Sequence, residues 1–491
     1  MSSAVNLRQP LEEQFRTCAL YVALFSLLPF LIIAAVNVLD ADLWWHLRTG
    51  QWIVEHRSVM HSDLFSWTGL GKPWASYSWL FEVLIYGFFV QFGLLGILIF
   101  TYTLLLSITI SLNTLIRKFE NRLAYSVGLT AVAMVAITRV SSPRPWLFTI
   151  LFICIELNIL VSVRKDRRFK KLLWLLLVFA LWANVHIQFV YGFLVLGAAI
   201  AEEVLNRLFG ARLKVGNDSE VPIPLNVSIS ITIGCILATL INPYHFRIYS
   251  VVIDTFKLGG LYDLIAELQS IPFRGLPDWL VLALVLGAAY VLGRDRSLNA
   301  FWLLLLVGSS FISFRGLRDV WFVVIIATTI IARSRSGKEG LIRKITKAQI
   351  GIVAVASFAV LMLIVSSLKI TNSVLEETIA KTYPADAARI VEQQRFEGPL
   401  FNHSNWGGYL IWRLRQLPVS IDGRSNIHNA GDLRQNFDVW KGRPNWSQDP
   451  HLMASKIVIG EKDFALTQLL REDPHWRIAY EDNVAVVFVR Q

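Results

Sequence analysis

The chain has 491 residues, of which 54% are hydrophobic and only 17% charged. This balance excludes an ordinary soluble globular protein and indicates a polytopic membrane protein. The formal net charge of +11 is divided among short connections between apolar runs, so it does not predict a nucleic-acid partner.

Apolar runs that suit a bilayer recur along the chain, since one crossing needs about 20 apolar residues. The stretch 172–205 has basic clusters at both ends, so we interpret it as two helices that turn at Asn184-Val185-His186. With this hairpin the sequence predicts eleven crossings, near residues 18–38, 94–115, 123–140, 146–163, 172–187, 189–205, 227–243, 279–292, 298–314, 320–332 and 350–368.

The connections between these runs alternate in charge. Every second connection is rich in Lys and Arg, which is typical of cytoplasmic loops. We therefore expect a multi-pass membrane protein with a cytoplasmic N-terminus and an extracytoplasmic C-terminal domain. The basic connections fall at residues 117–122, 164–171, 207–214, 294–296 and 333–347.

The first outer segment, residues 39–93, is rich in tryptophan and contains amphipathic stretches. This mixture is typical of helices that lie along a membrane surface. Together with the crossings, the segment forms a transmembrane domain of residues 1–370.

Residues 371–491 are polar enough for a water-soluble domain and alternate helix-like and strand-like patterns. Such alternation predicts a small α/β domain. The fold class is thus an all-α polytopic membrane protein with a C-terminal α/β domain. Its helices are expected at 384–394 and 464–471, its strands at 419–421 and 457–459, and a terminal hairpin at 476–480 and 484–489.

Asp40 and Asp42 directly follow the first crossing, with Trp44-Trp45-His46 behind them. Acids at this depth are costly unless they have a task. One carboxylate could act as a general base or orient an acceptor hydroxyl, and the other could assist it or bind a metal. Alternatively, the pair caps the following helix or marks the water boundary.

An acidic pair in the first outer loop, surface helices, a many-helix body and an external C-terminal domain resemble the GT-C membrane glycosyltransferases. This superfamily includes protein O-mannosyltransferases, the aminoarabinose transferase of lipid A and oligosaccharyltransferase catalytic subunits. The chain is more closely similar to a group of bacterial members, and this resemblance implies a location in the bacterial inner membrane. The segments that carry this similarity are residues 40–50, 63–68, 79–82, 182–186, 402–410 and 421–424.

The resemblance implies a polyprenyl-phosphate-linked sugar as donor, an external hydroxyl, amine or amide as acceptor, and Asp40 or Asp42 as the catalytic residue. We expect inversion, because a single carboxylate base permits direct displacement at the sugar. Trp406-Gly407-Gly408-Tyr409 is similar to the Trp-Trp-Asp-Tyr-Gly element of oligosaccharyltransferases. Its central acid is missing, so recognition of a peptide sequon is not implied.

A lipid phosphate needs cations near the outer leaflet. Arg144, Arg315 and Arg318 lie in outer connections, and the forked guanidinium suits phosphate. They could instead anchor helix ends by snorkelling.

Other polar residues could line the same cavity. His186 lies at a predicted turn, where a structural histidine held by a hydrogen bond is favoured. Glu82 lies among apolar residues, and if it is buried it needs a partner such as an arginine. A divalent cation could assist, although no dense cluster of ligands points to one. The cavity candidates are His46, Glu82, His186, Trp406, Tyr409, Asp422 and Arg424.

A non-catalytic transporter or scramblase of lipid-linked sugars is the alternative function. Such proteins carry polar residues at the midplane of several helices. Here the residues within the runs are overwhelmingly apolar and the acids gather at one face, which favours chemistry at the membrane surface.

Overall fold

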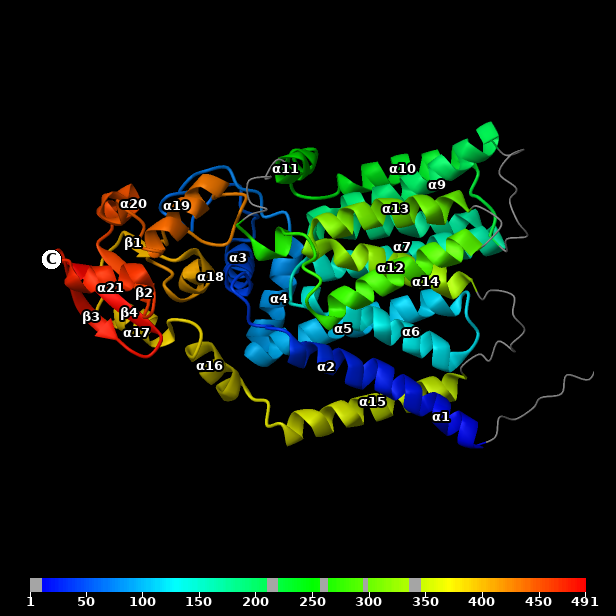
Figure 1. Cartoon of the computed structure of the whole chain (residues 1–491), viewed down its shortest axis with the longest axis horizontal. Helices are drawn as coiled ribbons and strands as arrows, with labels where there is room; N and C mark the ends of the chain where they lie inside the picture. Colours follow the sequence, from blue (N-terminus) through cyan, green and yellow to red (C-terminus); the bar gives the residue numbers. More distant parts are fainter. Residues whose placement is uncertain (1–10, 210–219, 257–263, 295–298, 335–345) are drawn as a thin grey trace, which may run out of the picture.

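The protein has two parts that lie along one long axis (Figure 1). The computed structural model describes residues 11–209, 220–256, 264–294, 299–334 and 346–491. A bundle of long helices forms one part, and a smaller domain with a β-sheet forms the other and carries the C-terminus. Parts of the basic connections at 207–214, 294–296 and 333–347 fall outside the described residues.

Each predicted crossing coincides with a helix of the bundle. The first is continuous from α1 (Leu11–Val22) through the π-helical turn η1 (Ala23–Leu27) to α2 (Leu28–Ala35). Within the described residues, six helices are long and apolar enough to span a membrane by length and composition, which is the pattern of a multi-pass membrane protein. The other bundle helices are α5 (Leu94–Arg117), α6 (Leu123–Ala136), α7 (Trp146–Asp166), α8 (Leu173–Val185), α9 (Val190–Phe209), α10 (Leu225–Thr239), α12 (Leu276–Arg294), α13 (Ala300–Arg315), α14 (Val320–Arg333) and α15 (Lys347–Ser367).

The predicted turn between α8 and α9 is confirmed. His186 is extended, with φ −160° and ψ 139°, and the 3₁₀ turn η4 (Ile187–Phe189) leads into α9. The side chain of Asn184 fixes this end of α8, because its Nδ2 donates to the Ile241 carbonyl at 2.7 Å and its Oδ1 accepts from Trp79 Nε1 at 2.8 Å.

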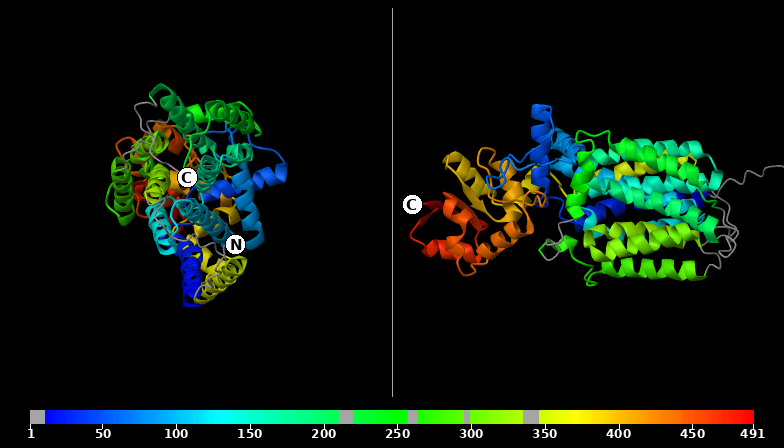
Figure 2. Two further views of the ribbon diagram at one scale, coloured as in Figure 1. Left: turned by 90° about the vertical axis from the view of Figure 1, so that its right-hand side faces the viewer. Right: turned by 90° about the horizontal axis from the view of Figure 1, so that it is seen from above.

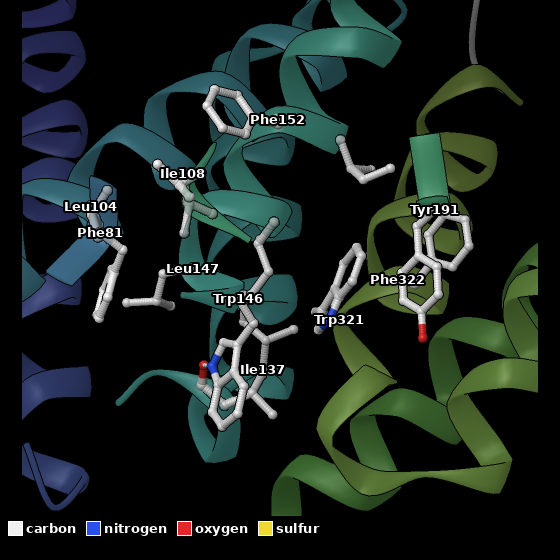
Figure 3. Close-up of a cluster of buried hydrophobic side chains, with 14 of the residues drawn as sticks. Phe81, Leu104, Ile108, Ile137, Trp146, Leu147, Phe152, Tyr191, Trp321 and Phe322 are labelled. Carbon is white, nitrogen blue, oxygen red and sulfur yellow. Dashed lines mark hydrogen bonds between the residues drawn. The ribbon is translucent and has the colours of Figure 1, made fainter. Parts of the chain in front are cut away.

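The interior of the bundle is filled with aliphatic and aromatic side chains (Figure 3). Helix α14 is buried at every residue from 320 to 330, as expected for a helix that is apolar all round. Its Phe322 stacks on Tyr191 of α9, with ring centroids 5.6 Å apart. Glu156 of α7 is an exception, because it is fully buried and neither carboxylate oxygen has a hydrogen-bond partner in the described part of the chain.

The first outer segment contains two helices, α3 (Leu43–His56) and α4 (Trp79–Phe92). Helix α3 lies across the long axis, between the bundle and the C-terminal domain, with α4 beside it (Figures 1 and 2). They pack tightly at Gly50, where a β-carbon would collide with the carbonyl group of Glu82. The predicted helices of residues 39–93 are therefore present, and Glu82 lies next to α3.

The C-terminal domain has a four-stranded sheet in the order β1-β2-β4-β3, with β1 and β2 parallel and the other pairs antiparallel. The predicted helices, the strand at 457–459 and the terminal hairpin are confirmed. The elements after the bundle are α16 (Asn372–Ala380), α17 (Ala385–Gln393), β1 (Leu400–Asn402), α18 (Ser404–Arg413), α19 (Ala430–Trp440), α20 (Pro450–Ala454), β2 (Ile457–Glu461), α21 (Ala465–Glu472), β3 (Trp476–Glu481) and β4 (Ala485–Arg490).

The predicted strand at 419–421 is wrong, because this segment is not part of the sheet. Val419 forms an isolated parallel bridge with Ser66 of the first outer segment. Val419 N–H donates to the Phe65 carbonyl at 3.1 Å, and Trp67 N–H donates to the Val419 carbonyl at 2.9 Å. The extended segment thus attaches the C-terminal domain to the outer loop of the bundle.

Candidate functional site

Asp40 and Asp42 lie between α2 and α3, and the side chain of Arg144 is bonded to both. Arg144 Nε is 2.9 Å from Asp40 Oδ2, and Nη1 contacts Asp42 Oδ2. Arg144 also lies over the ring of Trp146, 5.1 Å from its centroid. Because Arg144 lies just before α7, these bonds hold the first outer loop against another helix of the bundle.

The two acids have different surroundings. Asp40 Oδ1 accepts the backbone N–H groups of Asp42 and Leu43, each at 3.1 Å, so this residue caps the start of α3. Asp42 instead lines a cavity that Asp40 does not reach. Burial raises the pKa of Asp42 to about 6, although Arg144 lowers it. Of the two first-loop acids, Asp42 is therefore the one that could exchange a proton with a molecule in the cavity.

The cavity has a volume of about 560 Å³. Its walls come from α3, α4 and the outer connections of the bundle, and its roof comes from the C-terminal domain. The charged and titratable side chains that line it are Asp42, His46, Tyr77, Glu82, Arg144, His186, Glu267, Arg318 and Arg424.

Glu82 and His46 form a buried pair in the wall of this cavity. His46 Nδ1 is 3.2 Å from Glu82 Oε1, and the Ser76 hydroxyl donates to Glu82 Oε2. Burial raises the pKa of Glu82 to about 8, against the opposite effect of the Ser76 bond. Burial and the nearby Arg144 also hold the pKa of His46 well below its usual value. At neutral pH the pair therefore carries no net charge.

Arg318 lies where the cavity meets a second, apolar groove. Its Nε has no hydrogen-bond partner within the described residues, and the nearest acid, Asp319, is 3.9 Å from it. The groove has a volume of about 280 Å³ and is lined also by Leu194, Phe311 and Arg315. Because Leu194 is 48% and Phe311 71% exposed, the groove opens on the side of the bundle.

Arg424 closes the cavity from the C-terminal domain. Its Nη1 is 2.8 Å from Asp63 Oδ1, and its Nε and Nη2 bond both oxygens of Asp422 at 2.8 and 2.7 Å. The three side chains are fully buried. Burial raises the pKa of Asp422, but Arg424 and His428 lower it by more, so the pKa lies well below its usual range. This ion-paired cluster joins the outer loop to the C-terminal domain.

Most of the predicted site residues come together at the cavity: Asp42, His46, Glu82, Arg144, His186, Arg318 and Arg424. Arg315 lines the adjoining groove. His186 Nδ1 is 2.8 Å from Thr149 Oγ1, which agrees with the hydrogen-bonded histidine favoured from the sequence. His186 also lines the cavity.

Three residues expected to line the cavity do not. Trp406 packs inside the C-terminal domain, where its Nε1 donates to the Thr382 carbonyl at 3.2 Å. Tyr409 packs edge-on against Trp44, with centroids 5.1 Å apart. Asp422 is fully buried behind Arg424, which uses both of its oxygens. Of the three, Tyr409 contacts α3, and none lines the cavity.

Ser76, Tyr77 and Ser78 also line the cavity, and they are not among the residues predicted from the sequence. Tyr244 holds them in place, because its hydroxyl accepts the Ser76 N–H at 2.9 Å and donates to the Met60 carbonyl at 2.7 Å. The signal in the sequence is a Ser-Tyr-Ser stretch just before a predicted helix.

The residues present do not fit a divalent cation between the first-loop acids. Such ions need several free oxygen ligands, whereas Arg144 already bonds both carboxylates and Asp40 Oδ1 is used by the backbone. Within the described ranges, no three His, Cys, Asp or Glu residues gather in a way that could hold a metal. Arg144 itself supplies the positive charge at this position.

The chain matches no protein-family model, and no curated protein is similar to it in sequence. Its fold is similar to that of the apo oligosaccharyltransferase of Archaeoglobus fulgidus, with a TM-score of 0.51 and 10% identity over 94% of this chain and 70% of that one. A structure of the same archaeal enzyme, AglB, with an inhibitory peptide and a dolichol-phosphate gives a TM-score of 0.50 and 10% identity over 92% and 69%. The chain therefore shares the fold of this archaeal oligosaccharyltransferase, and oligosaccharyltransferase catalytic subunits are among the proteins that its sequence resembles.

Proposed function

We propose that this protein is a membrane glycosyltransferase that moves a sugar from a polyprenyl-phosphate donor to an extracytoplasmic acceptor. The observation that carries the proposal is the position of Arg318, which lines both the cavity of Asp42 and the lateral apolar groove. In this arrangement the sugar of the donor would lie beside the carboxylate of Asp42, and its phosphate would lie beside Arg318. The lipid tail would follow the apolar groove. The dolichol-phosphate bound by the archaeal enzyme supports a lipid-linked donor.

Asp42 acts as the general base in this proposal. The acceptor oxygen or nitrogen forms a bond to the anomeric carbon while the bond from that carbon to the phosphate oxygen breaks. The phosphate leaves with the electron pair, and Asp42 takes the acceptor proton. Attack from the side opposite the phosphate inverts the anomeric centre. Because the leaving phosphate is already charged, the reaction needs no separate general acid.

Arg318 holds the donor phosphate, with Arg315 further along the same groove. A guanidinium group suits this role because it stays charged and donates several hydrogen bonds to oxygen. Arg144 was also a candidate for the phosphate, but it bonds the two first-loop acids. We assign it the role of keeping Asp42 oriented and ionised.

The proposed orientation follows from the charge of the connections. The C-terminal domain and the cavity lie outside the bacterial inner membrane, and the basic connections lie in the cytoplasm. Polyprenyl-linked sugars in the outer leaflet would then reach the cavity through the groove beside α9 and α13.

The test compares envelope glycans and glycoproteins by mass spectrometry in a strain that lacks this protein. Wild type should restore a hexose or pentose mass, whereas Asp42→Asn and Arg318→Gln should not. Arg389→Gln removes an exposed arginine of the C-terminal domain and should restore it. Insertion is checked with a reporter at the C-terminus. If Asp42→Asn inserts normally and restores every missing mass, the proposal is wrong and a transporter or scramblase of lipid-linked sugars is favoured.

A further inference from the structure

A different groove, separate from the cavity and from the apolar groove at Arg318, lies on the side of the bundle. It is at the end remote from the C-terminal domain. It has a volume of about 780 Å³ and lies between α5 and α7. Hydroxyl and amide side chains line part of it, and Ile110, Leu151 and Ile155 line the rest. Asn158 Nδ2 donates to the Ser111 carbonyl at 2.9 Å, which ties the two helices together at its base.

The length of this groove matches one leaflet of a bilayer. It extends along α5 from Ser107 to Lys118, which is about 16 Å at 1.5 Å per residue. Half of the hydrocarbon core of a bilayer is about 15 Å. The groove is therefore long enough to hold an acyl chain that extends from the middle of a membrane to the surface opposite the C-terminal domain.

Two lysines lie at the surface end of the groove. Lys118 Nζ donates to Ser162 Oγ at 2.7 Å, and Lys171 pairs with Asp166 at a partly exposed position. The charge of Lys171 lowers the pKa of Lys118, in addition to the larger effect of burial. Asp166, which pairs with Lys171, acts on Lys118 in the opposite direction. The two lysines and this single acid leave a net positive charge at this end of the groove, which favours an anion. Trp174 is 63% exposed beside them, as is typical at the lipid–water boundary.

We propose that this groove binds an anionic phospholipid of the leaflet opposite the C-terminal domain. The phosphate of the lipid would lie between Lys118 and Lys171, and one acyl chain would follow the groove toward Ser107. The apolar lining and the leaflet length favour a lipid over free phosphate. This site is separate from the proposed catalytic cavity, because Ser162 and Arg144 lie at opposite ends of α7.

The test measures retention of phosphatidylglycerol by the delipidated full-length protein, using native mass spectrometry. Each lysine near a membrane surface contributes about 1 kcal/mol, or about a five-fold effect on affinity. The double variant Lys118→Gln/Lys171→Gln should therefore bind about 25-fold more weakly. Lys170→Gln removes an exposed charge that does not line the groove, and it should bind as the wild type does.

A second variant separates the groove from the charge. Ser107→Leu fills the deep end and keeps both lysines, so it should also weaken retention of phosphatidylglycerol. Phosphatidylcholine should bind more weakly than phosphatidylglycerol, and inorganic phosphate should not displace the lipid. The proposal is overturned if Lys170→Gln loses as much affinity as the double variant, if Ser107→Leu changes nothing, or if inorganic phosphate competes at equal concentration.

Discussion

Asp40 and Asp42 are separated by one residue, yet their surroundings give them different chemistry. Asp40 uses one oxygen to cap α3 and the other to bind Arg144. Asp42 faces the cavity and has a raised pKa. The bonds of Asp40 to the backbone at the start of α3 fit the alternative in which the pair caps this helix, whereas the proposed function assigns the base to Asp42.

The pH dependence of transfer should report the ionisation of Asp42. We expect kcat/KM to rise as the pH increases through about 6, because a base must first lose its proton. Arg144→Gln removes the charge that lowers the pKa of Asp42, so the rise should move to higher pH. The measurement is the pH profile with purified protein and a synthetic polyprenyl-phosphate sugar. Arg389→Gln should not move the rise, and an unmoved rise in Arg144→Gln would contradict the assignment.

Arg144 also predicts how the site responds to metal ions. Because its guanidinium bonds both acids, we expect chelation with EDTA to leave the transfer rate of the wild type unchanged. Arg144→Ala frees two carboxylates, which divalent ions prefer as ligands. Manganese should therefore raise the melting temperature of Arg144→Ala and not that of the wild type. Loss of wild-type transfer in EDTA, with recovery on adding metal, would refute this role of Arg144.

At the scale of elements, local patterns predicted the helices well. Hydropathy and charge are properties of each segment, so the bundle helices fall where the apolar runs do. The strand at 419–421 failed because its partner is Ser66, far away in sequence, and β1 was missed because its partner β2 is also distant. The sequence could select Asp42 from its place after a crossing. It could not show that Arg144 bonds this acid, because that contact depends on how α7 packs.

The loop that carries Gly423 sets the position of Asp42. A β-carbon at residue 423 would collide with Asp42 Oδ1, so Gly423→Ala should push the carboxylate away. A displacement of about 1 Å can reduce a rate about 100-fold, and we expect a loss of that order in transfer. Gly308→Ala in α13 is the control, since its β-carbon would meet open space. Equal activity in both variants, at equal melting temperatures, would show that the loop does not constrain Asp42.

At the scale of the whole molecule, the cavity exists only where the two parts meet. The bundle supplies Asp42, Glu82 and Arg318, and the C-terminal domain supplies Arg424. Gly408 of α18 lies against the Ala41 carbonyl, so the docked domain also contacts the loop that carries the proposed base, Asp42. Activity should therefore depend on how firmly the domain is held.

Arg424→Gln should loosen this docking more than any change of a surface arginine. It leaves the carboxylates of Asp63 and Asp422 buried without their cation, and breaking such a pair costs about 3–5 kcal/mol. Hydrogen exchange should increase at residues 61–68 and 419–428 and stay slow in α14, because the core of the bundle does not depend on this contact. Arg471→Gln breaks an exposed pair with Glu481, worth about 0–1 kcal/mol, and should change neither region. If exchange in α14 rises as much as at residues 61–68 and 419–428, the two parts unfold together. The ion-paired cluster then does not stabilise the docking of the C-terminal domain separately from the bundle.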